Sequence, residues 1–203
     1  MTHAFAELAF TQDVRAIQEE LGSRELYERF DAGEDSHRLL GPDEAVFLGA
    51  RDSFYMATVG ASGWPYVQHR GGPAGFVRVL DEATIGFADF RGNRQYVSVG
   101  NLSGDDRVSL IFVDYPNRRR LKLLGHVRFI APDDRVVLDR LAVPGYRARL
   151  ERGFLIDVAA YDWNCPQHIT PRFTQAEVAE AVAPLHARIA ELEEQLAGFA
   201  AEA

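Results

Sequence analysis

The sequence is poor in two residue types on which whole classes of site depend. Cys165 is the only cysteine among the 203 residues, which excludes an intrachain disulfide and a zinc site built from cysteines alone, and which is typical of a reducing compartment. Lys122 is the only lysine, against 21 arginines. It follows a leucine, so the Gly-Lys-Ser/Thr loop of ATPases and GTPases is absent. It also has no phosphate-binding glycines beside it, which argues against PLP chemistry on a lysine.

Long apolar runs and excess positive charge are missing as well. No apolar run approaches the roughly 20 residues of a membrane span, and the amino terminus lacks the basic-then-apolar layout of a signal peptide. We therefore expect a cytoplasmic protein with no membrane association. Thirty acidic and 22 basic side chains give a net charge of −8, which argues against nucleic acid as a partner. The six histidines show no zinc-protease spacing, and the serine-hydrolase and dinucleotide signatures are absent, so we expect no metal site.

The first 50 residues have a helical pattern. Apolar residues at helical spacing between Thr11 and Phe30 predict one helix broken near Gly22, or two short helices. Residues 31–38 are polar and predict a surface loop. Pro42, followed by two acidic residues, is typical of a helix start and predicts a short helix through about Ala50.

From residue 53 onward, short runs of β-branched and aromatic residues alternate with turn residues. The predicted strands are Phe54–Val59, Pro65–Arg70, Phe76–Leu80, Thr84–Phe87, Arg107–Asp114, Arg119–Ile130 and Gly153–Tyr161. Helical spacing predicts short helices over Gly92–Leu102 and Asp133–Leu141. Six or seven mostly antiparallel strands with small helices between them indicate an α+β fold, mostly β, in the form of a barrel.

The tail from Thr174 to Leu196 has a different pattern. Its apolar residues are spaced alternately four and three apart, as in the a/d seam of a coiled coil. Pro184 interrupts the run. The pattern therefore fits either a coiled coil or a helix packed on its own domain.

Two stretches indicate a site for a phosphorylated ligand. The segment Phe87–Ser98 lies where a strand is predicted to pass into a helix, and backbone N–H groups at a helix start, with Arg91, Asn93 and Arg94, would suit a phosphate monoester. The alternative is that these arginines are solvated surface residues. On the strand Pro65–Arg70, alternation places Gln68 and Arg70 on one face and His69 on the other. Such a face fits either a bound polar group or a solvated edge strand.

A third stretch, Asp162–Ile169, follows the last predicted strand. Trp163 offers a plane for stacking, and Asn164, Gln167 and His168 offer hydrogen-bonding groups. Cys165 and His168 alone do not complete a tetrahedral metal site.

Together these stretches resemble the pyridoxamine 5′-phosphate oxidase-like family of FMN-binding split barrels, over about Pro42 to Pro171. The resemblance implies a six-stranded antiparallel split barrel with flanking helices and a homodimer that binds two FMN molecules at its interface. It assigns the phosphate to Asn93 and Arg94, the flavin and ribityl chain to Gln68 and Arg70, and a cover over the partner's flavin to Trp163, Asn164 and Gln167. The full set of candidate cofactor residues is Gln68, His69, Arg70, Arg91, Asn93, Arg94, Gln95, Ser98, Trp163, Asn164 and Gln167.

The chain also departs from the vitamin B6 oxidases. It has Gln95 and Gly71-Gly72-Pro73 where those enzymes carry lysines, and it lacks their Arg-x-His near the carboxyl end. We therefore expect an FMN-dependent oxidoreductase acting on another small molecule, with a reduced nicotinamide or a protein as electron donor and Arg70 beside the reduced flavin. The alternatives are a flavin-binding or sensor module without turnover and a haem-binding barrel with His69 or His168 as axial ligand. The expected domains are an N-terminal helical extension (1–41), the split barrel (42–171) and a C-terminal helix (172–203).

Overall fold

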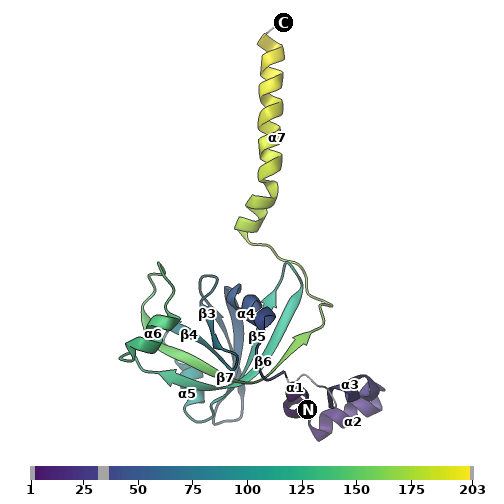
Figure 1. Ribbon diagram of the computed structural model, residues 1–203, viewed down its shortest axis with the longest axis vertical. Helices are drawn as coiled ribbons and strands as arrows, with labels where there is room; N and C mark the ends of the chain where they lie inside the picture. Colours follow the sequence, from purple (N-terminus) through teal and green to yellow (C-terminus); the bar gives the residue numbers. More distant parts are fainter. Residues whose placement is uncertain (1–2, 32–36, 202–203) are drawn as a thin grey trace. The chain divides into compact units, whose positions relative to one another are not determined.

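The computed structural model describes residues 3–31 and 37–201 (Figure 1). The chain forms two compact units. The first comprises Met1–Asp114 and Arg119–Pro166, and the second comprises Tyr115–Arg118 and Gln167–Ala203. Among the described residues, no helix has both the length and the apolar character that crossing a membrane requires.

Three short helices begin the first unit: α1 (Ala4–Ala9), α2 (Gln12–Glu20) and α3 (Arg24–Asp31). The Thr11 side chain caps α2 by accepting a hydrogen bond from the Val14 N–H. Gly22, with φ of 71°, separates α2 from α3. Of the two predictions for Thr11 to Phe30, the pair of short helices is therefore confirmed. Helix α1, which contacts the last strand, was not predicted. Of the predicted loop 31–38, residues 32–36 lie outside the described residues, and Asp31 is the last residue of α3.

All seven predicted strands form, in a single antiparallel sheet of order β2-β1-β5-β6-β7-β4-β3. The bounds are β1 Ser53–Val59, β2 Pro65–Gly71, β3 Val77–Asp81, β4 Thr84–Phe90, β5 Arg107–Asp114, β6 Arg119–Ile130 and β7 Leu150–Asn164. The predicted α+β barrel is confirmed, with one strand more than the six that the resemblance implies. Three helices lie between the strands or before them, namely α4 (Pro42–Gly49), α5 (Val97–Leu102) and α6 (Arg135–Leu141).

The core of this unit is aromatic. The rings of Phe54 and Phe112 lie 4.8 Å apart, and so do those of Phe87 and Phe154. The five central residues of β4, 85–89, are buried, whereas the edge strand β2 has no buried residue. The polar side chains of β2 therefore stand at the rim of a rigid barrel, where a ligand can reach them.

Two predicted boundaries are wrong in ways that matter for the site. Residues 92–96 are not helical: α5 begins only at Val97, because Arg94 and Tyr96 have φ of 64° and 54°, values incompatible with a right-handed helix. The last strand is longer than predicted, because β7 stays paired with β6 as far as Arg120↔Asn164. Trp163 and Asn164 thus belong to the strand and do not follow it.

The second unit contains the long helix α7 (Gln175–Ala201). Thr174 and Glu177 cap its start reciprocally: the Glu177 N–H donates to Thr174 Oγ1 at 3.2 Å, and the Thr174 N–H donates to Glu177 Oε2 at 2.7 Å. The helix continues through Pro184.

Candidate functional site

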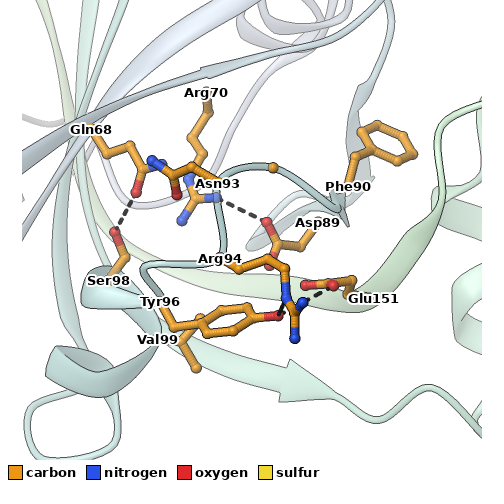
Figure 2. A pocket seen from close by; sticks show the side chains of 11 residues that line it. Gln68, Arg70, Asp89, Phe90, Asn93, Arg94, Tyr96, Ser98, Val99 and Glu151 are labelled. Atoms are coloured by element: carbon orange, nitrogen blue, oxygen red, sulfur yellow. Dashed lines mark hydrogen bonds and ion pairs between the residues drawn. The ribbon is translucent and has the colours of Figure 1, made fainter.

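A pocket of about 180 Å³ brings together β2, the end of β4, the segment 91–96, the start of α5 and the start of β7 (Figure 2). Its lining is mostly polar and contains two arginines and two carboxylates. The lining residues are Gln68, Arg70, Asp89, Phe90, Gly92, Asn93, Arg94, Tyr96, Ser98, Val99 and Glu151.

Strand β2 contributes two side chains from one face. Because side chains alternate along a strand, Gln68 and Arg70 both point to the pocket. Ser98 Oγ, from α5, donates a hydrogen bond to Gln68 Oε1 at 3.2 Å. His69 lies on the other face, where its ring packs edge-on against Tyr55 at 5.5 Å.

A buried carboxylate, that of Asp89 on β4, organises the cationic side of the pocket. Its Oδ1 accepts a hydrogen bond from Arg70 Nη1 at 2.9 Å, and its Oδ2 lies 3.4 Å from Arg152 Nε. Burial raises the pKa of Asp89, an effect that the two arginines oppose, and burial likewise lowers the pKa of Arg70. The Arg70 Nε–H is buried and has no hydrogen-bond partner. A donor of this kind is available to an anionic or carbonyl-bearing ligand.

The segment after β4 is held in an unusual conformation by its own side chains. The Gln95 N–H donates to Asn93 Oδ1 at 3.1 Å, which closes a turn. Arg94 Nε donates to the Tyr96 hydroxyl at 3.4 Å, and that hydroxyl donates to Glu151 Oε1 at 3.3 Å (Figure 2). Left-handed conformations at non-glycine residues are costly and concentrate at binding sites. Two of them within three residues indicate a segment shaped for a ligand.

The surroundings of the pocket are positive in an otherwise acidic chain. Arg91 Nε lies 3.8 Å from Glu151 Oε1, and the Arg152 guanidinium lies 5.3 Å from the centre of the Tyr96 ring. Counting these two with the pocket arginines, four guanidinium groups surround the two carboxylates of Asp89 and Glu151. The excess of about two positive charges suits a phosphate monoester, which carries a similar negative charge near neutral pH.

The structure brings five predicted residues into this pocket and leaves six outside it. Inside are Gln68, Arg70, Asn93, Arg94 and Ser98. Arg91 is paired with Glu151, His69 faces away, and Gln95 is exposed. The other three are Trp163 and Asn164, which line a different cavity, and Gln167, which is exposed in a turn of the second unit. The predicted helix start at Gly92 is wrong: the helix begins at Val97, and residues 92–96 form a strained loop.

Sequence reasoning missed Asp89, Tyr96 and Glu151. A signal for Asp89 was present, because it is the only charged residue in the apolar run Ile85–Phe90. A charged side chain that is buried within a strand is normally paired with an opposite charge or hydrogen bonded. Tyr96 was instead assigned to the helical pattern, and nothing local marks Glu151.

The second cavity has a volume of about 470 Å³ and lies between the N-terminal helices and the ends of β6 and β7. Trp163 Nε1 donates to Glu44 Oε1 at 2.7 Å, and the Arg119 guanidinium lies 4.4 Å from the centre of the indole. Lys122 pairs with Asp162 at 2.9 Å on the same wall. Within its own chain, the indole is thus held in place by α4 and β6. Across residues 3–31 and 37–201, no group of three His, Cys, Asp or Glu side chains is placed to hold a metal ion.

The comparisons with known proteins agree with this architecture. The family model described as pyridoxamine 5′-phosphate oxidase matches residues 42–153, more than half of the chain. Among solved structures, HupZ of Group A Streptococcus is 16% identical and has a TM-score of 0.50, with 66% of this chain and all of that chain covered. A putative pyridoxamine 5′-phosphate oxidase from Lactobacillus delbrueckii is 19% identical, with a TM-score of 0.46 and coverage of 62% and 94%.

An FMN-binding protein from Syntrophomonas wolfei is 15% identical, with a TM-score of 0.44 and coverage of 76% and 96%. The search of curated proteins found no match. The family match spans α4, the strands β1 to β6 and the first residues of β7, and it contains every residue that lines the pocket described above. The chain therefore belongs to the pyridoxamine 5′-phosphate oxidase family.

Proposed function

We propose that the protein is an FMN-binding flavoprotein that acts as an oxidoreductase on a small molecule. The observation that carries the proposal is the pocket in which the strained Asn93–Arg94 segment meets Gln68 and Arg70 of β2. Family membership supports a flavin, and the arginines support one with a terminal phosphate.

The residues present fit such a group. The positive excess around the pocket matches the charge of a phosphate monoester, and Arg70 offers a buried Nε–H that has no partner in the protein. The pocket volume of about 180 Å³ is below the roughly 300–1,000 Å³ of a complete small-molecule site. We therefore assign it to the phosphate and the adjoining part of the ribityl chain, with the ring system extending beyond it.

The roles of the side chains follow from their chemistry. Arg94 and the Asn93 amide would hold the phosphate, and Gln68 and Arg70 would bind the remainder of the cofactor. When bound, FMN supplies hydride transfer at its ring system, so the protein contributes binding, orientation and electrostatics. Asp89 acts through Arg70, because its carboxylate fixes the guanidinium at 2.9 Å. Glu151 acts similarly through the Tyr96 hydroxyl.

Cofactor identity is tested by acid release from the purified protein followed by chromatography. We expect FMN, and recovery of FAD or of no flavin would contradict the proposal. Bleaching of the flavin absorbance by NADH or NADPH under anaerobic conditions would favour an oxidoreductase over a module that only binds flavin. A sharp Soret band in place of the flavin bands would identify a haem protein.

We further propose that the cofactor site is completed in a homodimer, where Trp163, Asn164 and Gln167 of one protomer cover the flavin of its partner. Trp163 and Asn164 line the second cavity of their own chain and not the pocket that we assign to the phosphate. This location supports a role at the site of a partner protomer. A ligand that binds only the assembled form stabilises the dimer by linkage. In sedimentation at low micromolar concentration, the holoprotein should be a dimer and the flavin-stripped protein should dissociate more readily. A monomer that retains FMN would refute the shared site.

A further inference from the structure

Helix α7 carries an exposed apolar stripe along its length. This α7 seam consists of Val178, Val182, Leu185, Ile189, Leu192 and Leu196. Five of these six side chains are exposed, with exposed fractions from 41% at Leu192 to 67% at Leu196. The sixth, Val182, is half-buried. The alternation of four- and three-residue steps is the 3.5-residue period of a coiled coil. An apolar stripe needs an apolar surface to cover it, and this period is the one that fits a partner helix.

The residue types along the α7 seam indicate what that partner is. With Val182 as an a position, the two central heptads have Val182 and Ile189 at a and Leu185 and Leu192 at d. At the ends of the seam, Val178 falls at d and Leu196 at a. β-branched residues at a with leucine at d favour parallel two-stranded coiled coils, because each side chain packs well into the holes of an identical facing helix. The α7 seam is therefore complementary to a second copy of itself.

The flanking charges favour the same arrangement. Arg188 lies at a g position and Glu193 at the following e position. In a parallel in-register pair, each Arg188 faces the Glu193 of the other helix, which gives two symmetric ion pairs. An antiparallel pair places g opposite g and e opposite e. The g residues Ala181, Arg188 and Gln195 include no acid, so Arg188 would lose its ion pair, and the e positions offer Glu193 only His186 as a partner. In the single chain Arg188 pairs with Glu191 at 2.8 Å, and both side chains are about 60% exposed, so this pair is weak enough to exchange.

Pro184 does not obstruct this pairing. It occupies a c position, on the side of the helix away from the α7 seam, and α7 continues through it. Its ring therefore points away from the partner helix, and its cost is one missing backbone hydrogen bond together with a local bend.

We propose that α7 pairs with α7 of a second copy as a parallel two-stranded coiled coil. The partner is another molecule of this protein, and the helices pair in register along as much as about 40 Å, the length of 27 helical residues. This pairing is independent of the flavin chemistry proposed above. It gives the protein a dimer contact that does not depend on the cofactor.

Cysteine crosslinking in the full-length protein tests the pairing directly. In a Cys165→Ser background, which removes the only natural thiol, Leu192→Cys places a thiol at a d position. In a parallel in-register pair it faces its own copy, so mild oxidation should convert most of the protein to a covalent dimer. Ala187→Cys, at an f position on the outer face, is the matched control and should stay largely reduced.

The ion pairs are tested by exchanging the charges in the Leu192→Cys protein. Arg188→Glu or Glu193→Arg alone should slow crosslinking about two- to fivefold, the range for exposed ion pairs, and the double exchange should restore the rate. If Leu192→Cys stays reduced while the protein still sediments as a dimer, the helices do not pair and only the barrel interface survives. Equal crosslinking of Leu192→Cys and Ala187→Cys would overturn the parallel register, and a failure of the double exchange would overturn the proposed ion pairs.

Discussion

Arg94→Ala should weaken FMN binding while leaving riboflavin binding and folding nearly unchanged. Arg94 is exposed, and its side chain is held by the long 3.4 Å hydrogen bond from Arg94 Nε to the Tyr96 hydroxyl. Truncation therefore removes little from the free protein. Hydrogen bonds to charged groups contribute about 1.5–3 kcal/mol, so loss of the phosphate contact should raise the Kd for FMN roughly ten- to 150-fold.

The comparison of two ligands makes this test specific. Titration of flavin-stripped protein, followed by flavin fluorescence, gives Kd values for FMN and for riboflavin, which lacks the phosphate. Arg128→Ala is the control, because Arg128 is an exposed arginine that forms a bidentate pair with Asp157 outside the pocket. Equal losses for FMN and riboflavin in Arg94→Ala would place the guanidinium elsewhere on the cofactor. Unchanged FMN affinity would show that Arg94 is a solvated surface residue.

Two further predictions concern stability. Gly86→Ala should lower the free energy of unfolding by about 1–3 kcal/mol, because the added Cβ would lie 2.8 Å from Leu141 Cδ2. In α5, Gly100→Ala should raise the free energy of unfolding by about 0.4–1 kcal/mol, because the added Cβ would have nothing within 4 Å. Thermal melts of both variants check the pair, and equal losses would contradict the packing. Hydrogen bonds from Arg107 lower the pKa of Asp105 from 3.8 to about 2, so the stability that this carboxylate contributes above pH 4 is lost as the pH falls toward 2. Asp105→Asn should therefore show a smaller drop in Tm over that interval, and an identical pH profile would contradict this assignment.

The strands could be predicted well from the sequence, because the alternation of side chains between the two faces of a strand can be read from a few neighbouring residues. Each strand was located to within a few residues, and the shared face of Gln68 and Arg70 followed from the same alternation. The helical pattern failed at 92–96, where Tyr96 has the spacing of a helix but a left-handed backbone. Asp89 and Glu151 come together because β4 pairs with β7, and Trp163 is hydrogen bonded to Glu44 119 residues away. Contacts between such distant residues have no signature in the local sequence.

The pairing of β4 with β7 has a consequence for how the chain folds as it is made. Thr84 pairs with Asp157, so the ribosome must add about 70 more residues before β4 can pair with β7. At roughly 5–20 residues per second, synthesis of that stretch takes about 4–15 s. During that time the strand Thr84–Phe90, which is buried almost throughout in the native sheet, has only the short strand β3 beside it. The growing chain is therefore most prone to aggregation between the synthesis of β4 and that of β7, and truncation before residue 150 would leave that apolar edge permanently open.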